Sequence, residues 1–158
     1  MSPEKTRMDY ISRINNVIDY IDKHLNDDLT LKKLADVANF SEFHFHRVFS
    51  SIVREPLYKF IRRIRLERAA DILINHPDKT IFDVACETGF NGPSQFSRAF
   101  SEHFGFSPSE WQSNQFEMKN SIITENSKNR KMNDKDCKYL INSDDYICDV
   151  IFTDYIKN

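Results

Sequence analysis

Glycine and proline are scarce in this chain of 158 residues, which contains only three glycines and five prolines. Loop-rich all-β folds draw heavily on both residues for their tight turns, so this scarcity argues against a fold of that class. No run of about 18 apolar residues occurs, which excludes a membrane-spanning helix. The first residues, MSPEKTRMDY, are charged and lead into no apolar stretch, so we expect no secretory signal.

Cysteine pairs and catalytic motifs are also missing. Cys86, Cys137 and Cys148 are odd in number, widely spaced and never in a CxxC pair, which fits reduced cytoplasmic thiols and excludes a disulfide framework or zinc site. His44 and His46 lie about 200° apart on a helix and cannot chelate one metal together. No nucleophile–base pairing, Gly-rich phosphate loop or HExxH occurs. We therefore expect a cytoplasmic protein with no catalytic residues, no metal and no cofactor.

Excess positive charge is the last notable absence. Residues 1–112 contain 15 Lys and Arg against 16 Asp and Glu. Nucleic-acid-binding proteins are usually basic, because neutralising phosphates supplies much of their affinity. Any DNA binding by this chain must therefore come from the position of its positive charges and not from their sum.

What the sequence does contain, up to Trp111, is helical periodicity. Apolar residues at spacings of three and four predict an amphipathic helix over 8–25. Thr30, Ser41 and Thr80 are N-cap residue types, and Pro56 suits the start of a long helix. Ser107 to Glu110 reads as a capping box with proline at the first helical position. Seven helices and no convincing strand are predicted, over 8–25, 31–37, 42–53, 56–74, 80–89, 94–104 and from 108.

The first part of the chain repeats itself. Residues 30–40 resemble residues 80–90 at a constant offset of fifty, and after one inserted residue the pattern Phe-x-Arg-x-Phe of 45–49 recurs at 96–100. Asn39 and Gly89 occupy matching turns, where a left-handed backbone is needed. Each copy has the requirements of a helix-turn-helix. A generic helical hairpin would explain one copy, but two matched copies favour a duplicated helix-turn-helix.

The second helix of the first copy has two unlike faces. Its apolar stripe consists of Phe45, Val48, Phe49 and Ile52, and the opposite face carries Phe43, His46, Arg47 and Ser50. These are either scattered surface residues or a face for the major groove. In the groove, Arg47 would bind guanine O6 and N7, His46 a base edge and Phe43 a thymine methyl.

The second copy and the long helix offer further polar candidates. Ser94, Gln95 and Arg98 lie opposite the core-facing Phe96, Ala99 and Phe100, and Asn91 precedes the helix where a phosphate would fit. The helix over 56–74 carries the basic residues Lys59, Arg62, Arg63, Arg65 and Arg68. These either form a solvated face or contact phosphates, and Arg62 and Arg65 are the candidates for contact with DNA. Its roughly 19 residues span about 28 Å. That length is near the roughly 34 Å between successive major grooves, so one chain could place both reading helices on one duplex.

These motifs resemble the AraC/XylS family of bacterial regulators over about residues 10–112. The most specific part is Ala85-(x)3-Gly89-Phe90-(x)5-Phe96-x-Arg98-x-Phe100-(x)4-Gly105-x-Ser107-Pro108, and the upstream strings are Ser41-x-Phe43-His44-Phe45-x-Arg47-x-Phe49 and Arg62-x-x-Arg65-Leu66-x-x-Ala69. The resemblance implies a seven-helix, two-lobed domain that binds asymmetric double-stranded DNA sites and usually activates transcription through RNA polymerase. It also implies the base-reading residues, which are Phe43, His46 and Arg47 in the first unit and Pro93, Ser94, Gln95 and Arg98 in the second.

Two positions depart from the family pattern. Ser101 and Gln112 stand where relatives commonly have a basic residue. Together with the nearly balanced charge, this predicts weak phosphate anchoring and an affinity that falls early with salt.

The domain organisation expected is a DNA-binding domain over 8–112, a linker rich in Asn, Ser and Lys over 113–135, and a short tail over 136–158 with strand patterns at 139–141 and 146–152. The tail is too short for the gyrase-inhibitor-like effector domain of many relatives. A small-molecule effector is therefore expected only if the tail belongs to a larger domain. A remnant, a truncation and a small add-on stay open. The alternative to a DNA-binding regulator is a helical protein-interaction module, such as an antagonist of a full-length relative.

Overall fold

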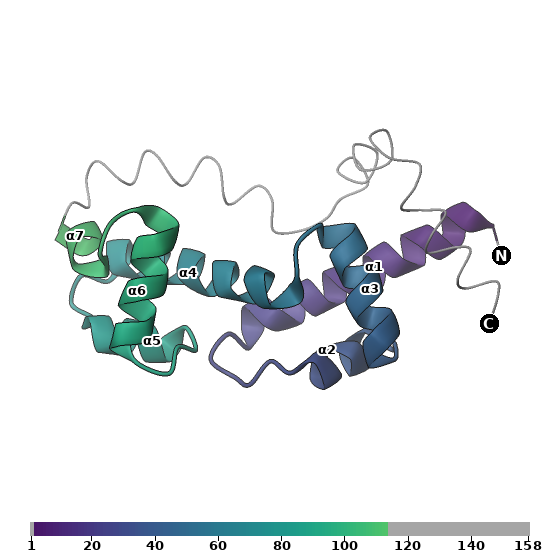
Figure 1. The fold of residues 1–158 in the computed structure, drawn as a ribbon, viewed down its shortest axis with the longest axis horizontal. Helices are drawn as coiled ribbons and strands as arrows, with labels where there is room; N and C mark the ends of the chain where they lie inside the picture. The colour runs from purple at the N-terminus through teal and green to yellow at the C-terminus, as the bar shows by residue number, and fades with distance from the viewer. Residues whose placement is uncertain (1, 114–158) are drawn as a thin grey trace. The chain divides into compact units, whose positions relative to one another are not determined.

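The computed structural model describes residues 2–113 and shows seven α-helices and no strand in that part of the chain (Figure 1). The helices are α1 (Pro3–Lys23), α2 (Leu31–Ala38), α3 (Glu42–Val53), α4 (Leu57–Asn75), α5 (Ile81–Glu87), α6 (Pro93–Phe104) and α7 (Pro108–Ser113). The predicted all-α fold is confirmed. Helix α7 includes Ser113, the first residue of the predicted linker, and the rest of the predicted linker and tail lies outside the described residues.

Two helices begin earlier than their apolar pattern predicts. Helix α1 starts at Pro3 and not near Met8, because Ser2 accepts a hydrogen bond from the backbone N–H of Lys5 at 3.4 Å and proline fits the first helical position. Helix α6 starts at Pro93 because proline fits the first helical position, with the extended Gly92 before it and no side-chain cap. Polar first turns have no apolar periodicity, so the pattern alone places these starts too late.

The predicted N-caps are present. The side chains of Thr30, Ser41 and Thr80 each accept a hydrogen bond from the backbone N–H three residues later, at 3.3, 3.3 and 3.1 Å. The two turns also have the predicted backbone, with φ of 54° at Asn39 and 81° at Gly89. Local sequence therefore sets where the short helices of both repeats begin and turn.

The described residues form two compact units. Unit 1 contains residues 2–20 and 30–57, and unit 2 contains residues 21–29 and 58–113. Unit 1 holds α2 and α3, and unit 2 holds α5, α6 and α7. Each unit thus contains one copy of the repeat, as the two-lobed prediction requires.

The core of unit 1 comes from three helices. Its buried side chains include Ile11, Ile14, Val17 and Ile18 of α1, Leu34, Ala35 and Ala38 of α2, and Phe45, Val48 and Phe49 of α3. Ile52, predicted in the same stripe, is only partly buried. Small residues at Ala35 and Ala38 let α2 pack closely against α3.

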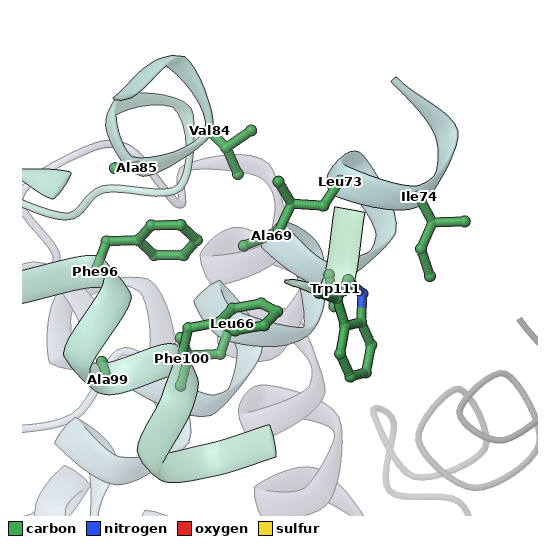
Figure 2. Close-up of a cluster of buried hydrophobic side chains, with 11 residues drawn as sticks. Leu66, Ala69, Leu73, Ile74, Val84, Ala85, Phe96, Ala99, Phe100 and Trp111 are labelled. Carbon is green, nitrogen blue, oxygen red and sulfur yellow. The ribbon is translucent and has the colours of Figure 1, made fainter. Parts of the chain in front are cut away.

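Unit 2 has a core rich in aromatic rings. Leu66, Ala69 and Leu73 of α4 pack with Val84 and Ala85 of α5, Phe96, Ala99 and Phe100 of α6, and Trp111 of α7 (Figure 2). The Trp111 ring lies 5.5 Å from that of Phe100 and 4.8 Å from that of Phe104. Trp111 is the only tryptophan in the chain and is 1% exposed, so its fluorescence reports on the folding of unit 2.

None of the helices in residues 2–113 combines the length and apolar character needed to cross a membrane. The same residues bring together no group of three or more His, Cys, Asp or Glu side chains able to hold a metal ion.

Two capping boxes in unit 2 make its stability sensitive to acid. Asp83 accepts hydrogen bonds from the Thr80 hydroxyl at 2.7 Å and its backbone N–H at 3.1 Å, and Glu110 accepts one from the Ser107 N–H at 2.8 Å. These bonds lower the pKa of both carboxyl groups. A lowered pKa stabilises the fold above the unfolded-state pKa, and that stability is lost as pH falls through the folded-state value.

We therefore expect the urea midpoint of unit 2, followed by Trp111 fluorescence, to fall as the pH drops below about 4. The double variant Asp83→Asn, Glu110→Gln should show a weaker dependence over the same range, because neither replacement titrates. An unchanged dependence in the double variant would show that other groups cause the acid sensitivity.

Candidate nucleic-acid interface

Helix α3 presents a polar and aromatic face opposite its buried stripe. Phe43 is 73% exposed, and the guanidinium carbon of Arg47 lies 5.6 Å from the centre of its ring. His46 is exposed, whereas Arg47 and Ser50 are partly buried. The structure thus places the four residues predicted for this face on the outer side of α3. A cation over an aromatic ring is favourable and keeps Arg47 beside Phe43.

A cluster from α1 and the α2–α3 turn supports the base of this face. The ring of His44 lies 4.9 Å from that of Phe40 and 5.6 Å from that of Tyr10, and its Nε2 is 3.3 Å from the Tyr10 hydroxyl. Burial, and secondarily the charge of Arg47, lowers the pKa of His44. His44 is therefore neutral at pH 7 and holds the first turn of α3 to α1.

Arg13 of α1 fixes the turn itself. Its guanidinium donates hydrogen bonds to the carbonyl oxygens of Ala38 at 3.3 Å and Asn39 at 3.4 Å, and it lies 5.2 Å from the centre of the Phe40 ring. The same side chain forms an ion pair with Asp9 at 2.8 Å. Sequence reasoning missed Arg13, because a polar residue on an amphipathic helix gives no signal of the turn that it contacts.

Helix α6 offers the corresponding face in unit 2. Pro93, Ser94, Gln95 and Arg98 are all exposed, and Arg98 has 85% of its side chain accessible. The backbone N–H of Asn91 donates to the side-chain oxygen of Gln95 at 3.4 Å. No side chain caps the first turn of α6, so backbone N–H groups at this end remain available to an anion.

The two candidate arginines of α4 have different environments. Arg62 is half exposed and forms an ion pair with Glu102 of α6 at 2.7 Å. Arg65 is partly buried and donates hydrogen bonds to the carbonyl oxygens of Leu25 at 2.9 Å and Asp27 at 3.1 Å. Burial lowers the pKa of Arg65, and the charge of Asp28 opposes that shift. Two N–H groups of Arg65 thus bind the α1–α2 connection and are not available to DNA in this arrangement. The contact of Arg65 with DNA stays a prediction.

Most of the residues predicted for unit 2 line one groove of about 770 Å³. The groove lies between the α1–α2 connection, one side of α4 and the start of α6, and its predicted members are Arg62, Arg65, Asn91, Gln95 and Arg98. Pro93 and Ser94 are not among its lining residues. Asp27 and Asp28 also line it, so acidic and basic side chains share this groove.

Comparison with known proteins agrees with this architecture. A family model described as a helix-turn-helix domain matches residues 34–114, just over half of the chain. The chain is 28% identical over 135 residues to an HTH-type transcriptional regulator of Staphylococcus aureus, and the match covers 85% of this chain but only 17% of that regulator. The chain thus corresponds to a small part of the length of this relative.

Two solved structures share the fold. A transcriptional regulator with an AraC-type DNA-binding domain from Chromobacterium violaceum matches with a TM-score of 0.63 at 20% identity, over 68% of this chain and 95% of that one. The DNA-binding domain of the global transcriptional factor AdpA, solved in complex with a target DNA, matches with a TM-score of 0.60 at 24% identity, over 63% and 89% of the two chains. From the match of the family model together with the duplicated helix-turn-helix fold, this chain belongs to the AraC-type helix-turn-helix family of transcriptional regulators.

Proposed function

We propose that this chain binds double-stranded DNA sequence-specifically, reads two successive major grooves with α3 and α6, and activates transcription by contacting RNA polymerase. The observation that carries the proposal is that the second helix of each helix-turn-helix has one buried face and one exposed face with hydrogen-bonding side chains. An α-helix fits the major groove, where the base edges differ in their donors and acceptors.

In the first groove, the exposed face of α3 suits direct reading of bases. Arg47 can donate two hydrogen bonds to guanine O6 and N7, and Phe43 beside it offers an apolar surface for a thymine methyl. The 5.6 Å contact between these two side chains orders them before DNA arrives. His46, exposed on the same face, can donate or accept at a base edge.

In the second groove, Gln95 and Arg98 of α6 have complementary chemistry. Gln95 can bind adenine through N6 and N7, and Arg98 can bind guanine or a phosphate. Pro93 and Ser94 are small enough to let the start of α6 approach the DNA closely. Arg62 and the backbone around Asn91 suit the phosphates beside that groove.

The duplication supports the proposed reading of two grooves. Helix α4 joins the two copies along the chain, and its 19 residues amount to about 28 Å of helix, compared with roughly 34 Å for one turn of DNA. AdpA, whose domain shares the fold, is bound to a target DNA in its solved structure. The role as activator and the contact with RNA polymerase rest on the resemblance to the family.

A fluorescence-anisotropy titration of the full chain tests the proposal. Because the operator is not known, the duplex is first selected from a random-sequence pool and then compared with a scrambled duplex at several salt concentrations. We expect Arg47→Ala and Arg98→Ala each to weaken binding to the selected duplex by roughly 5- to 150-fold, which corresponds to about 1–3 kcal/mol per bidentate contact. If the arginine contacts a base, its removal should weaken binding to the selected duplex only. If it contacts a phosphate, its removal should weaken binding to both duplexes.

Lys5→Ala is the control, because it removes one exposed positive charge in the first turn of α1, outside both reading faces.

Hydroxyl-radical footprinting should show two protected windows about 10 base pairs apart on one face of the duplex. In a separate assay, the bound protein should raise transcription by purified RNA polymerase. A single window would overturn the reading of two grooves. Failure to select any duplex at low salt would support the protein-interaction module instead.

A further inference from the structure

The strongest feature not used by the proposed function is Glu102, which lies one turn after Arg98 on α6. Its Oε2 is 2.7 Å from Nη2 of Arg62, and its Oε1 is 3.7 Å from Nε of Arg98. One carboxylate therefore pairs with two guanidinium groups from different helices of unit 2. Both arginines are candidates for contact with DNA, and both line the same groove.

This ion-pair cluster contributes little to the stability of the fold. The side chains of Arg62, Arg98 and Glu102 are 49%, 85% and 57% exposed, and ion pairs between exposed side chains contribute little to stability. The helices are held together by the buried core around Phe96 and Phe100, which does not depend on Glu102. The main effect of the carboxylate is thus on the charge that unit 2 presents to a ligand.

A carboxylate and a phosphate compete for the same partners. Both are anionic acceptors that favour the N–H groups of arginine, so Glu102 occupies donors that DNA would use. It also repels any phosphate brought close to Arg62 or Arg98. The effect adds to that of Asp27 and Asp28, which line the same groove.

We propose that Glu102 sets the affinity of this protein for DNA by acting as an internal competitor of the DNA phosphates for Arg62 and Arg98. The inference rests on the proposed function and deepens it. Glu102 keeps the sequence-independent attraction to the phosphate backbone low, so that binding depends more on base contacts. That attraction supplies nearly all of non-specific binding and also contributes to specific binding, so Glu102 lowers the affinity for an operator and for bulk DNA alike.

Glu102→Gln is the direct test, because glutamine keeps the size of the side chain and removes the charge. With all 158 residues present in the same titrations, we expect Glu102→Gln to bind both the selected and the scrambled duplex about 3- to 10-fold more tightly at low salt. The plot of log K against log salt should steepen by about one unit, as for one additional effective phosphate contact.

Glu87→Gln is the matched control. Glu87 lies in the same unit and pairs with Lys79 at 2.7 Å, so this variant makes the same change in net charge away from the two arginines. We expect less than a twofold change. In an Arg62→Ala, Arg98→Ala background, Glu102→Gln should also lose most of its effect, because interacting residues are not additive. Trp111 fluorescence and circular dichroism check that each variant is folded.

The outcomes separate this inference from the proposed function. If the unaltered protein selects no duplex, the proposed function fails first. If it binds DNA and Arg98→Ala weakens binding, but Glu102→Gln behaves like Glu87→Gln, Glu102 is not a competitor. Weaker binding by Glu102→Gln would also overturn the inference, since the carboxylate would then position the arginines for DNA.

Discussion

Gly89→Ala is expected to destabilise unit 2 by roughly 3 kcal/mol or more, at the upper end of what single substitutions do. Gly89 has a φ of 81°, and a left-handed backbone costs a residue with a Cβ about 1–2 kcal/mol. A Cβ there would also overlap the carbonyl oxygen of Leu25 and lie 2.8 Å from the guanidinium of Arg65. The Leu25 oxygen belongs to the backbone and accepts a hydrogen bond from Arg65, so it cannot move cheaply.

Gly105→Ala is the matched control for the clash. Gly105 has a similar φ of 78°, but nothing lies within 4 Å of a Cβ built there, so only the backbone strain of about 1–2 kcal/mol should remain. Urea unfolding followed by Trp111 fluorescence measures both variants in the same unit. Equal losses for the two glycines would show that the turn at Gly89 relaxes away from Leu25.

Phe100→Ala should cost unit 2 about 3–5 kcal/mol, which is typical for removing a fully buried phenylalanine. Phe100 is 0% exposed, and its ring lies 5.6 Å from Phe96, 4.6 Å from Phe104 and 5.5 Å from Trp111. The truncated side chain would lose its contacts with all three rings and leave a cavity between them. Since α6 carries Gln95 and Arg98, DNA binding should fall with the folded fraction.

Phe82→Ala is the control for Phe100→Ala. Phe82 lies in the same unit on α5 but is 58% exposed, so its truncation should change the urea midpoint only slightly. In thermal unfolding followed by circular dichroism, the Tm of Phe100→Ala should lie well below that of Phe82→Ala, and the Tm of Phe82→Ala should lie close to that of the unaltered protein. A small effect of Phe100→Ala would mean that neighbouring rings collapse into the space.

The faces of α3 and α6 were predictable from the sequence, because helical periodicity fixes which side chains share a side. Phe45, Val48 and Phe49 are buried and Phe43 is exposed, as the 100° rotation per residue requires. The caps at Thr30, Ser41 and Thr80 and the turns at Asn39 and Gly89 were predictable too, since each depends on the conformational preference of one residue. The roles of the exposed residues in reading bases stay predictions.

The sequence alone determined two things: apolar periodicity and the scarcity of glycine and proline indicated a helical fold up to Trp111, and the lack of net positive charge indicated that any DNA binding depends on where the charges lie. Only the tertiary structure decided where several of those charges are used. It assigns Arg65 partly to the backbone of residues 25–27, Arg13 to the turn at Asn39, and Glu102 to two candidate DNA-binding arginines. These contacts join residues between 26 and 40 positions apart, apart from Arg98 and Glu102 on one helix. Helical periodicity reports only the face of a single helix, so the partner that a charged side chain finds on another element is set by the packing of the fold.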